Sequence, residues 1–180
     1  MREGEPGHRE DGVGGRTDRA PGRRIRPFSR SLPMQLMRVR ELVMQRFRPN
    51  LHSHGLTDQQ WRIVRALAEA ESLEILEVSA LCCIHPASLS RILPKLEAIG
   101  YLSRRVNKAD QRRVIISLTA DGRRLFETIS PESEATYDSL EREVGAEQLE
   151  RLYNALDAVA ASLSRETGAK AQRQTNRRPP

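Results

Sequence analysis

The stretch "VNKADQRRVIISLT", residues 106–119, indicates which fold the chain adopts. It contains a polar turn between two short runs rich in β-branched residues, and the turn carries an acid and adjacent arginines. Runs of this kind joined by a polar turn predict a two-stranded hairpin. The second run ends at Thr119, a residue type that caps helices, so a helix is predicted to begin directly after the hairpin.

Helical periodicity surrounds this hairpin, because apolar residues recur at three- and four-residue spacing on both sides of it. Thr57 and Gln60 form a capping box, and Pro86 suits a first helical position. Pro94 and Pro131 are predicted to bend the helices that contain them. The predicted helices cover residues 32–49, 57–67, 74–82, 86–99, 119–145 and 149–163.

Two short helices joined by "CCIHPAS", residues 82–88, precede the hairpin, and the second of them is basic. This order predicts a mainly α fold with a small β-hairpin, arranged as a winged helix-turn-helix. The major groove of DNA admits one α-helix, whose N-terminal turn brings side chains to the base edges. A hairpin beside that helix can place an arginine in the adjacent minor groove.

Length and composition limit the classes of protein to which the chain can belong. With 180 residues it can form one ordinary domain with a core, but not two full ones. It has no apolar run of membrane-spanning length, and its start lacks the apolar segment of a secretory signal, so a cytoplasmic location is predicted. The adjacent Cys82 and Cys83 cannot form a disulfide framework and are predicted to be free thiols.

Charge is distributed unevenly along the sequence. Residues 1–30 and 165–180 are polar and net positive, which predicts disordered basic tails around a domain at 31–164. Within that domain, residues 86–113 carry seven Lys and Arg against two acids, whereas residues 127–150 carry eight acids against one Arg. This segregation indicates a basic face that binds a polyanion.

The predicted DNA contacts combine the basic helix with the hairpin. Serine hydroxyls in the first turn can donate or accept hydrogen bonds, and Arg91 can reach a guanine edge or a phosphate. Asp110 is interpreted as the partner that orients Arg112 or Arg105, although a plain charged turn on a solvated hairpin would give the same pattern. The predicted DNA-binding residues are Ser88, Ser90, Arg91, Lys95, Arg104, Arg105, Lys108, Asp110, Arg112 and Arg113.

The segment "DQRRVIISLTADG", residues 110–122, resembles the wing signature of the MarR family. The matching positions are Asp110, Arg112, Leu118, Thr119 and Gly122, and the similarity extends over residues 32–164. The resemblance implies a DNA-binding transcriptional repressor that acts as a homodimer on a pseudo-palindromic operator.

The same resemblance implies a helical dimerisation region formed by residues 32–53 and 119–164, with a DNA-binding lobe at 57–118. Apolar stripes at 32–47 and 149–163 permit this arrangement, because one small lobe cannot easily bury them. The alternative is that both stripes form the ordinary core of a monomer.

The segment "FRPNLHSHGLTDQQWRI", residues 47–63, resembles the branch of the family that represses aromatic-acid catabolism, of the homoprotocatechuate type. This resemblance implies that a small aromatic carboxylic acid releases the repressor from DNA and that an aromatic-compound degradation operon is controlled. A guanidinium can hold a carboxylate and an indole can stack on a ring, although Trp61 could equally be a core residue and the histidines ordinary loop residues. The predicted ligand-binding residues are Arg40, Arg46, His52, His54 and Trp61.

Other functions are less consistent with the sequence. A thiol-based redox regulator using Cys82 or Cys83 and a ligand-blind DNA-binding protein of the same fold are the alternatives. The sequence has no glycine-rich phosphate loop, nucleophile elbow or metal-ligand cluster, so neither an enzyme nor a cofactor or metal site is predicted.

Overall fold

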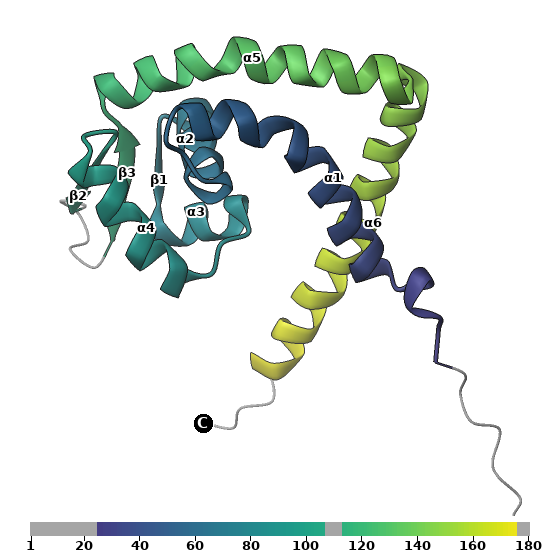
Figure 1. The fold of residues 1–180 in the computed structure, drawn as a ribbon. Helices are drawn as coiled ribbons and strands as arrows, with labels where there is room; N and C mark the ends of the chain where they lie inside the picture. The colour runs from purple at the N-terminus through teal and green to yellow at the C-terminus, as the bar shows by residue number, and fades with distance from the viewer. Residues whose placement is uncertain (1–24, 107–112, 176–180) are drawn as a thin grey trace, which may run out of the picture. The chain divides into compact units, whose positions relative to one another are not determined.

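The structure, a computed structural model, describes residues 25–106 and 113–175, with side chains as far as residue 165 (Figure 1). Residues 1–39 and 40–180 form two separate units. In the first unit, the described residues form a short 3-10 helix, Phe28–Arg30, and the first turns of α1 (Leu32–Ser53). This 3-10 helix lies inside the tail predicted to lack structure, and the Gln35 side chain donates a hydrogen bond to the Ser29 carbonyl at 2.7 Å.

The second unit contains the end of α1 and the remaining elements. These are α2 (Asp58–Ala70), β1 (Ser72–Glu74), α3 (Ile75–Cys82), α4 (Pro86–Ala98), β2 (Leu102–Val106), β3 (Val114–Leu118), α5 (Ala120–Val144) and α6 (Ala146–Thr175). The predicted winged helix-turn-helix is confirmed, because α3 and α4 are followed directly by the hairpin of β2 and β3.

A third strand, β1, was not predicted from the sequence. It pairs antiparallel with β3, so that the sheet has the order β1-β3-β2. Leu73 lies opposite Ile116 in this register, and both side chains are buried. The predicted helix at 74–82 therefore begins one residue later, at Ile75, because Glu74 belongs to the strand and caps the helix.

The core of the second unit lies among α2, α3, α4 and the sheet. Helix α5 contributes Ile129, which is fully buried. The predicted capping box of α2 is present, since the Thr57 hydroxyl accepts from the Gln60 amide and the Gln60 side chain accepts from the Thr57 amide. The other fully buried large side chains are Leu51, Leu56, Ile63, Val64, Leu67, Val78, Leu89, Leu93, Leu96 and Ile116.

Helix α4 runs from Pro86 to Ala98 with Pro94 inside it, and α5 likewise contains Pro131. Leu93 and Leu96 on either side of Pro94 are 2% and 0% exposed, so packing into the core offsets the backbone hydrogen bond that proline cannot donate. Within the described residues, no single helix is long and apolar enough to cross a membrane, and only the bent pair of α3 and α4 has a suitable composition.

Helix α6 extends to Thr175, into the segment 165–180 that was predicted to be a disordered tail. That segment is rich in Ala, Lys, Arg and Gln, which favour helix even where no apolar stripe accompanies them. Residues 1–24 and 176–180 of the predicted tails lie outside the described part of the chain.

The start of α5 packs tightly against the segment that precedes the hairpin. Thr119 caps α5 by accepting from the Gly122 amide at 3.1 Å, and the Thr119 amide donates to the Tyr101 carbonyl. A Cβ atom on Gly122 would lie 2.1 Å from the Tyr101 carbonyl oxygen, which is closer than atoms can approach. Only glycine therefore allows α5 to begin at this distance from the hairpin.

Replacing Gly122 with Ala is expected to lower the free energy of unfolding by about 1–3 kcal/mol, because backbone must move to admit the methyl group. The sign is diagnostic, since glycine to alanine in a helix normally stabilises by about 1 kcal/mol. Urea denaturation followed by circular dichroism measures the change. The neighbouring exposed Arg123→Ala serves as the control, and a stabilised Gly122→Ala variant would contradict the packing described.

Candidate nucleic-acid interface

The turn between α3 and α4 is fixed by the core and by local hydrogen bonds. The two helices meet at 107°. Ile84 in the turn is 2% exposed, its amide donates to the Ser79 carbonyl at 3.1 Å, and its carbonyl accepts from the Ser79 hydroxyl at 2.8 Å. Cys83 adopts the left-handed conformation that ends α3. The orientation of α4 relative to the lobe is therefore set by structure on both sides of the turn.

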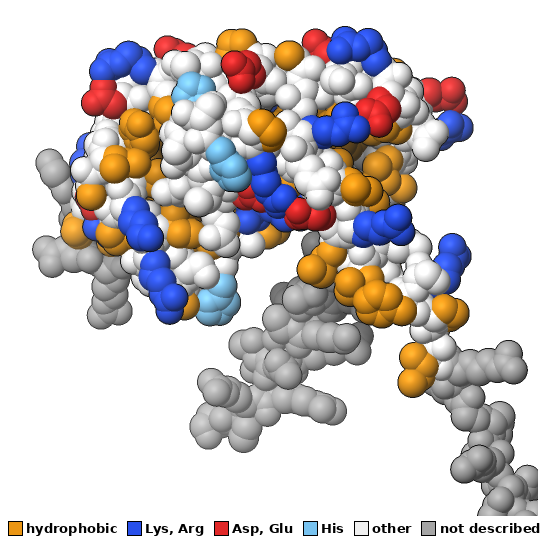
Figure 2. All heavy atoms as spheres, in the orientation of Figure 1, with side chains coloured by type: hydrophobic (Ala, Val, Ile, Leu, Met, Phe, Trp, Pro, Cys, Tyr) orange, Lys and Arg blue, Asp and Glu red, His pale blue; other side chains and the backbone are white. Residues whose placement is uncertain are grey.

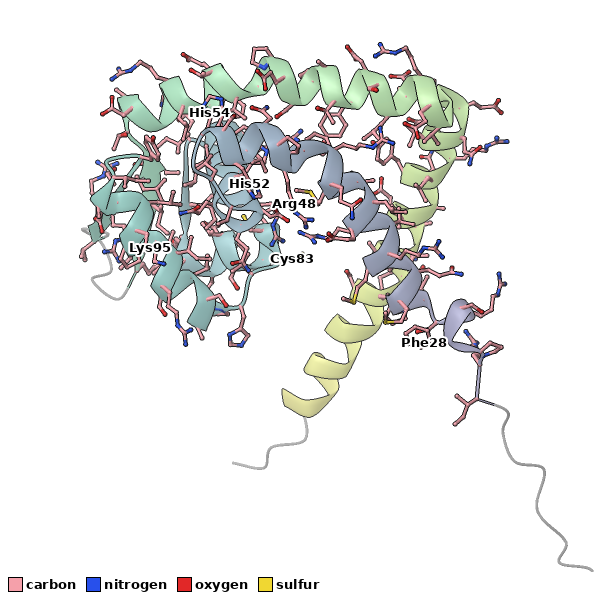
Figure 3. The ribbon with its side chains drawn as sticks, viewed as in Figure 1. Phe28, Arg48, His52, His54, Cys83 and Lys95 are labelled. Atoms are coloured by element: carbon pink, nitrogen blue, oxygen red, sulfur yellow. The ribbon has the colours of Figure 1, made fainter. Side chains whose placement is uncertain are left out.

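Helix α4 has one buried and one exposed face. Leu89, Leu93 and Leu96 are buried, whereas Arg91 and Lys95, one turn apart, are exposed. In Figure 2, Lys and Arg side chains gather on the part of the surface that α4 forms, and Figure 3 labels Lys95 on this helix. The exposed face of α4 is therefore basic, as predicted for a helix that enters a DNA groove.

The serines predicted to read DNA differ in what they offer. Ser90 is exposed, and its hydroxyl donates to the Ala87 carbonyl at 2.8 Å, so the hydroxyl can only accept from another partner. Ser88 is half-buried. Both lie in the first turns of α4, where the sequence placed them.

The arginines of the hairpin are held by acids of the same chain. Arg104 lies opposite Ile116 in the sheet, on the face that also carries the buried Leu102 and Leu118, and its Nε donates to the Glu97 carboxylate of α4 at 2.7 Å. Arg113 similarly pairs with Glu74 at 2.7 Å. From the sequence, these arginines were predicted to belong to an exposed basic surface. In the structure, each of them is paired with a carboxylate of the same chain.

Arg105 differs from its neighbour because successive side chains of a strand point to opposite faces. It lies opposite Ile115 and is exposed. The exposed cations Arg91, Lys95 and Arg105 therefore dominate the described surface around α4 and the hairpin. Lys108, Asp110 and Arg112 lie outside the described residues, so the predicted pairing of Asp110 with an arginine stays a prediction.

The residues predicted to bind a ligand have different surroundings in the structure. Trp61 is 6% exposed and stacks on Phe126 with ring centroids 5.8 Å apart. Arg46 pairs with Glu143 on α5. His52 is an exposed residue in the last turn of α1, and His54 follows that helix (Figure 3).

Arg40 belongs to an ion cluster that joins α1 to the start of α2. Its guanidinium lies 3.5 Å from the carboxylate of Asp58, the first residue of α2. Arg48 also donates to Asp58, at 3.0 Å, and to Glu41 of its own helix. The hydrogen bond from Arg48 lowers the pKa of Asp58, so this carboxylate stays ionised.

A cluster that the sequence analysis missed lies one turn beyond Trp61. Arg65 donates to the Tyr137 hydroxyl of α5 at 3.0 Å, and its guanidinium lies 5.6 Å from the centroid of the Tyr137 ring. The Tyr137 ring also contacts Phe47 of α1, edge to face, at 4.9 Å. The available signal was the four-residue spacing of Trp61 and Arg65, which places both on one side of α2.

Arg65 keeps its charge in this setting. Burial acts to lower its pKa, but the hydrogen bond to Tyr137 and the nearby Glu69 carboxylate raise the pKa above the ordinary arginine value. Arg65 also lines a hollow of about 420 Å³ between α2 and α3. The hollow is lined by Arg62, Arg65, Ala66, Glu69, Ala70, Leu81 and Cys82.

The two cysteines are free, as predicted, but they differ in exposure. Cys82 is 3% exposed, and burial raises the pKa of its thiol, which disfavours the reactive thiolate. Cys83 is exposed. Across residues 25–106 and 113–165, the side chains form no group of three His, Cys, Asp or Glu that could hold a metal ion.

Comparison with known proteins places the chain among transcriptional regulators. A family model described as "Transcriptional regulator SarA/Rot" matches residues 45–129. The chain is 39% identical over 130 residues to the HTH-type transcriptional regulator FarR of Neisseria gonorrhoeae, covering 72% of this chain and 89% of FarR. It is 37% identical over 131 residues to the homoprotocatechuate degradative operon repressor of Escherichia coli, covering 73% and 88% of the two chains.

A solved structure supports the same grouping. NadR, in a crystal structure with 4-hydroxyphenylacetate, superposes with a TM-score of 0.67 at 38% sequence identity. The match covers 76% of this chain and 97% of the NadR chain. The similarity therefore includes nearly the whole length of these relatives.

Replacing Glu97 with Gln is expected to tighten binding to duplex DNA of random sequence, because Arg104 then loses its internal partner and can contact a phosphate. One added phosphate contact should steepen the plot of log affinity against log salt by about one unit. Fluorescence anisotropy across a salt titration measures this. Glu147→Gln, the same charge change on α6, is the matched control, and an equal effect in both variants would show that only net charge matters.

Proposed function

The chain belongs to the MarR family of transcriptional regulators, and on that premise we propose that it represses transcription by binding a pseudo-palindromic operator as a homodimer. It is a regulator and has no catalytic role. We further propose that a small aromatic carboxylic acid releases it from DNA, that the repressed genes form an aromatic-compound degradation operon, and that it acts in the cytoplasm.

The observation that carries the DNA-binding part is the exposed basic face of α4 beside a hairpin. An α-helix fits the major groove, and Arg91 and Lys95 lie on the face that the core leaves exposed. The hairpin follows α4 directly, so its exposed Arg105 is available to an adjacent groove or to the phosphates. No other described surface combines a helix of this kind with a wing.

Exposed apolar stripes support the homodimer. In α6, Leu152, Leu156 and Val159 are 39–44% exposed at helical spacing. In the first unit, Leu32 and Leu36 of α1 are 51% and 45% exposed. A monomer core would bury these side chains, so the alternative of an ordinary monomer is less consistent with their exposure. Two-fold symmetry would then place two copies of α4 about 34 Å apart, in successive major grooves.

The effector proposal rests on Arg65 and on the relatives. The NadR crystal structure contains 4-hydroxyphenylacetate, and the Escherichia coli relative represses an operon for homoprotocatechuate degradation. In this chain, Arg65 offers a half-buried guanidinium over the ring of Tyr137, and Trp61 lies one helical turn before it on α2. A guanidinium can hold a carboxylate through two hydrogen bonds while an aromatic side chain contacts the ring.

Release from DNA would occur by population shift. An acid that binds equally well to the DNA-competent and the released form shifts nothing, so it must prefer a spacing of the two lobes that does not fit successive grooves. A thiol-based redox regulator is the alternative function, and the exposure of Cys83 favours it. The buried Cys82 with its raised thiol pKa weighs against it.

Changing Arg112 to Ala is expected to weaken binding to a duplex that the wild-type protein has selected from a random pool, and to flatten its salt dependence by about one unit of slope. The reason is that a hairpin arginine contributes charge to the complex. Fluorescence anisotropy at several salt concentrations measures both quantities. Arg151→Ala on α6 is the control, and unchanged binding of the Arg112 variant across the titration would remove the hairpin from the interface.

Thermal denaturation with a panel of benzoates, hydroxyphenylacetates, cinnamates and hydroxynicotinates tests the effector. At least one acid should raise the melting temperature and release the selected duplex, because it binds the folded protein. Arg65→Gln should bind that acid at least about tenfold more weakly, since a charge-assisted pair is lost.

Arg46→Gln is the matched control for Arg65→Gln, because Arg46 was predicted from the sequence to bind the ligand but is paired with Glu143 at the surface. Loss of the effect in Arg46→Gln alone would favour the sequence prediction over Arg65. A panel without any shift would favour a ligand-blind DNA-binding protein.

A further inference from the structure

His85 is the residue that caps the N-terminus of α4, a role that the sequence analysis did not assign. It has an extended backbone, and its Nδ1 atom accepts a hydrogen bond from the Ala87 amide at 3.2 Å. Pro86, the first residue of the helix, has no N–H, so Ala87 carries the first backbone donor that needs a partner. The imidazole satisfies that donor.

This hydrogen bond determines where the imidazole carries its proton. A backbone N–H can only donate, so Nδ1 must present its lone pair. A neutral histidine with an unprotonated Nδ1 carries its hydrogen on Nε2. The His85 side chain is exposed, and it therefore presents a neutral N–H donor at the reading end of α4.

The neutral N–H of His85 differs from what the neighbouring exposed side chains can offer to DNA. The Ser90 hydroxyl already donates to the Ala87 carbonyl and can only accept from a duplex. Arg91, the residue after Ser90, donates as a full cation. Within the described part of α4 and its cap, His85 is thus the exposed residue that offers an uncharged donor.

We propose that the Nε2–H of His85 donates a hydrogen bond to a lone-pair acceptor of the DNA duplex while Nδ1 continues to cap α4. The acceptor class comprises guanine O6 and N7, adenine N7, thymine O4 and the phosphate oxygens. The proposal rests on the proposed function, because α4 must enter the groove for His85 to reach DNA. In this proposal His85 contacts DNA directly, and its contribution to the binding affinity does not depend on a positive charge.

The test replaces His85 by residues that keep the cap and remove the ring. Serine is among the preferred N-cap residues, so His85→Ser should retain the melting temperature of the wild type while losing the Nε2 donor. Binding is measured on the duplex selected by the wild-type protein and on a scrambled duplex of equal length. Asn154→Ser, which removes an uncharged side-chain N–H donor at an exposed position on α6, is the matched control.

His85→Ser is expected to bind the selected duplex about tenfold more weakly, the effect of one hydrogen bond. The slope of log affinity against log salt should not change, because no charge is removed. A loss confined to the selected duplex identifies a base edge as the acceptor, and an equal loss on both duplexes identifies a phosphate.

Wild-type affinity in His85→Ser, or a salt slope reduced by about one unit, would overturn the proposal, since the second result would mean that the imidazole acts as a cation. If His85→Ser melts at a lower temperature, His85→Thr, another preferred N-cap residue whose short side chain has no ring N–H, decides the question by the same measurements. Failure of the wild-type protein to bind any duplex would refute the proposed function itself and the His85 contact with it.

Discussion

Burial of one face of α4 is the constraint on which the rest of the lobe depends. Leu89, Leu93 and Leu96 are at most 2% exposed, and burying a side chain of this size contributes about 1.5–3 kcal/mol. Because the three side chains anchor the helix at three- and four-residue intervals, its rotation about its own axis is fixed. The opposite face, with Arg91 and Lys95, must therefore point to solvent, where a polyanion can reach it. The charge of this surface follows from the packing of the leucines beneath it.

Fewer cations are free to bind a polyanion on the surface of the lobe than the number of its basic residues suggests. Glu97 holds Arg104 and Glu74 holds Arg113, so two guanidinium groups of the hairpin are paired inside the chain. Exposed ion pairs of this kind contribute little to stability. Their main effect is to fix the direction of the arginines and to compete with phosphate for them. In the proposed complex with DNA, Glu97 and Glu74 would therefore compete with the phosphates for Arg104 and Arg113.

Helix α2 connects the candidate effector site with the turn that orients α4. Its first residue, Asp58, is held by Arg48 of α1, and Arg65 in its middle donates to Tyr137 of α5. On the adjacent side, Arg62 donates to the Cys82 carbonyl at 2.5 Å, and the Cys82 thiol lies 3.5 Å from the Arg62 carbonyl. Since Cys82 is the last residue of α3, any displacement of α2 acts on the segment that leads into α4. A continuous set of contacts of this kind can carry coupling between two sites.

The sequence by itself determined the local elements: the Thr57–Gln60 capping box, the start of α4 at Pro86 and the hairpin were predicted, because caps, turns and periodicity act over a few residues. Strand β1 was missed, since three residues carry no period and its formation depends on pairing Leu73 with the distant Ile116. Only the tertiary structure decided which charged groups meet. Arg65 contacts Tyr137 and Arg104 contacts Glu97 because folded helices and strands bring them together. Spacing along the chain predicts which residues share one face of an element, but not which elements meet.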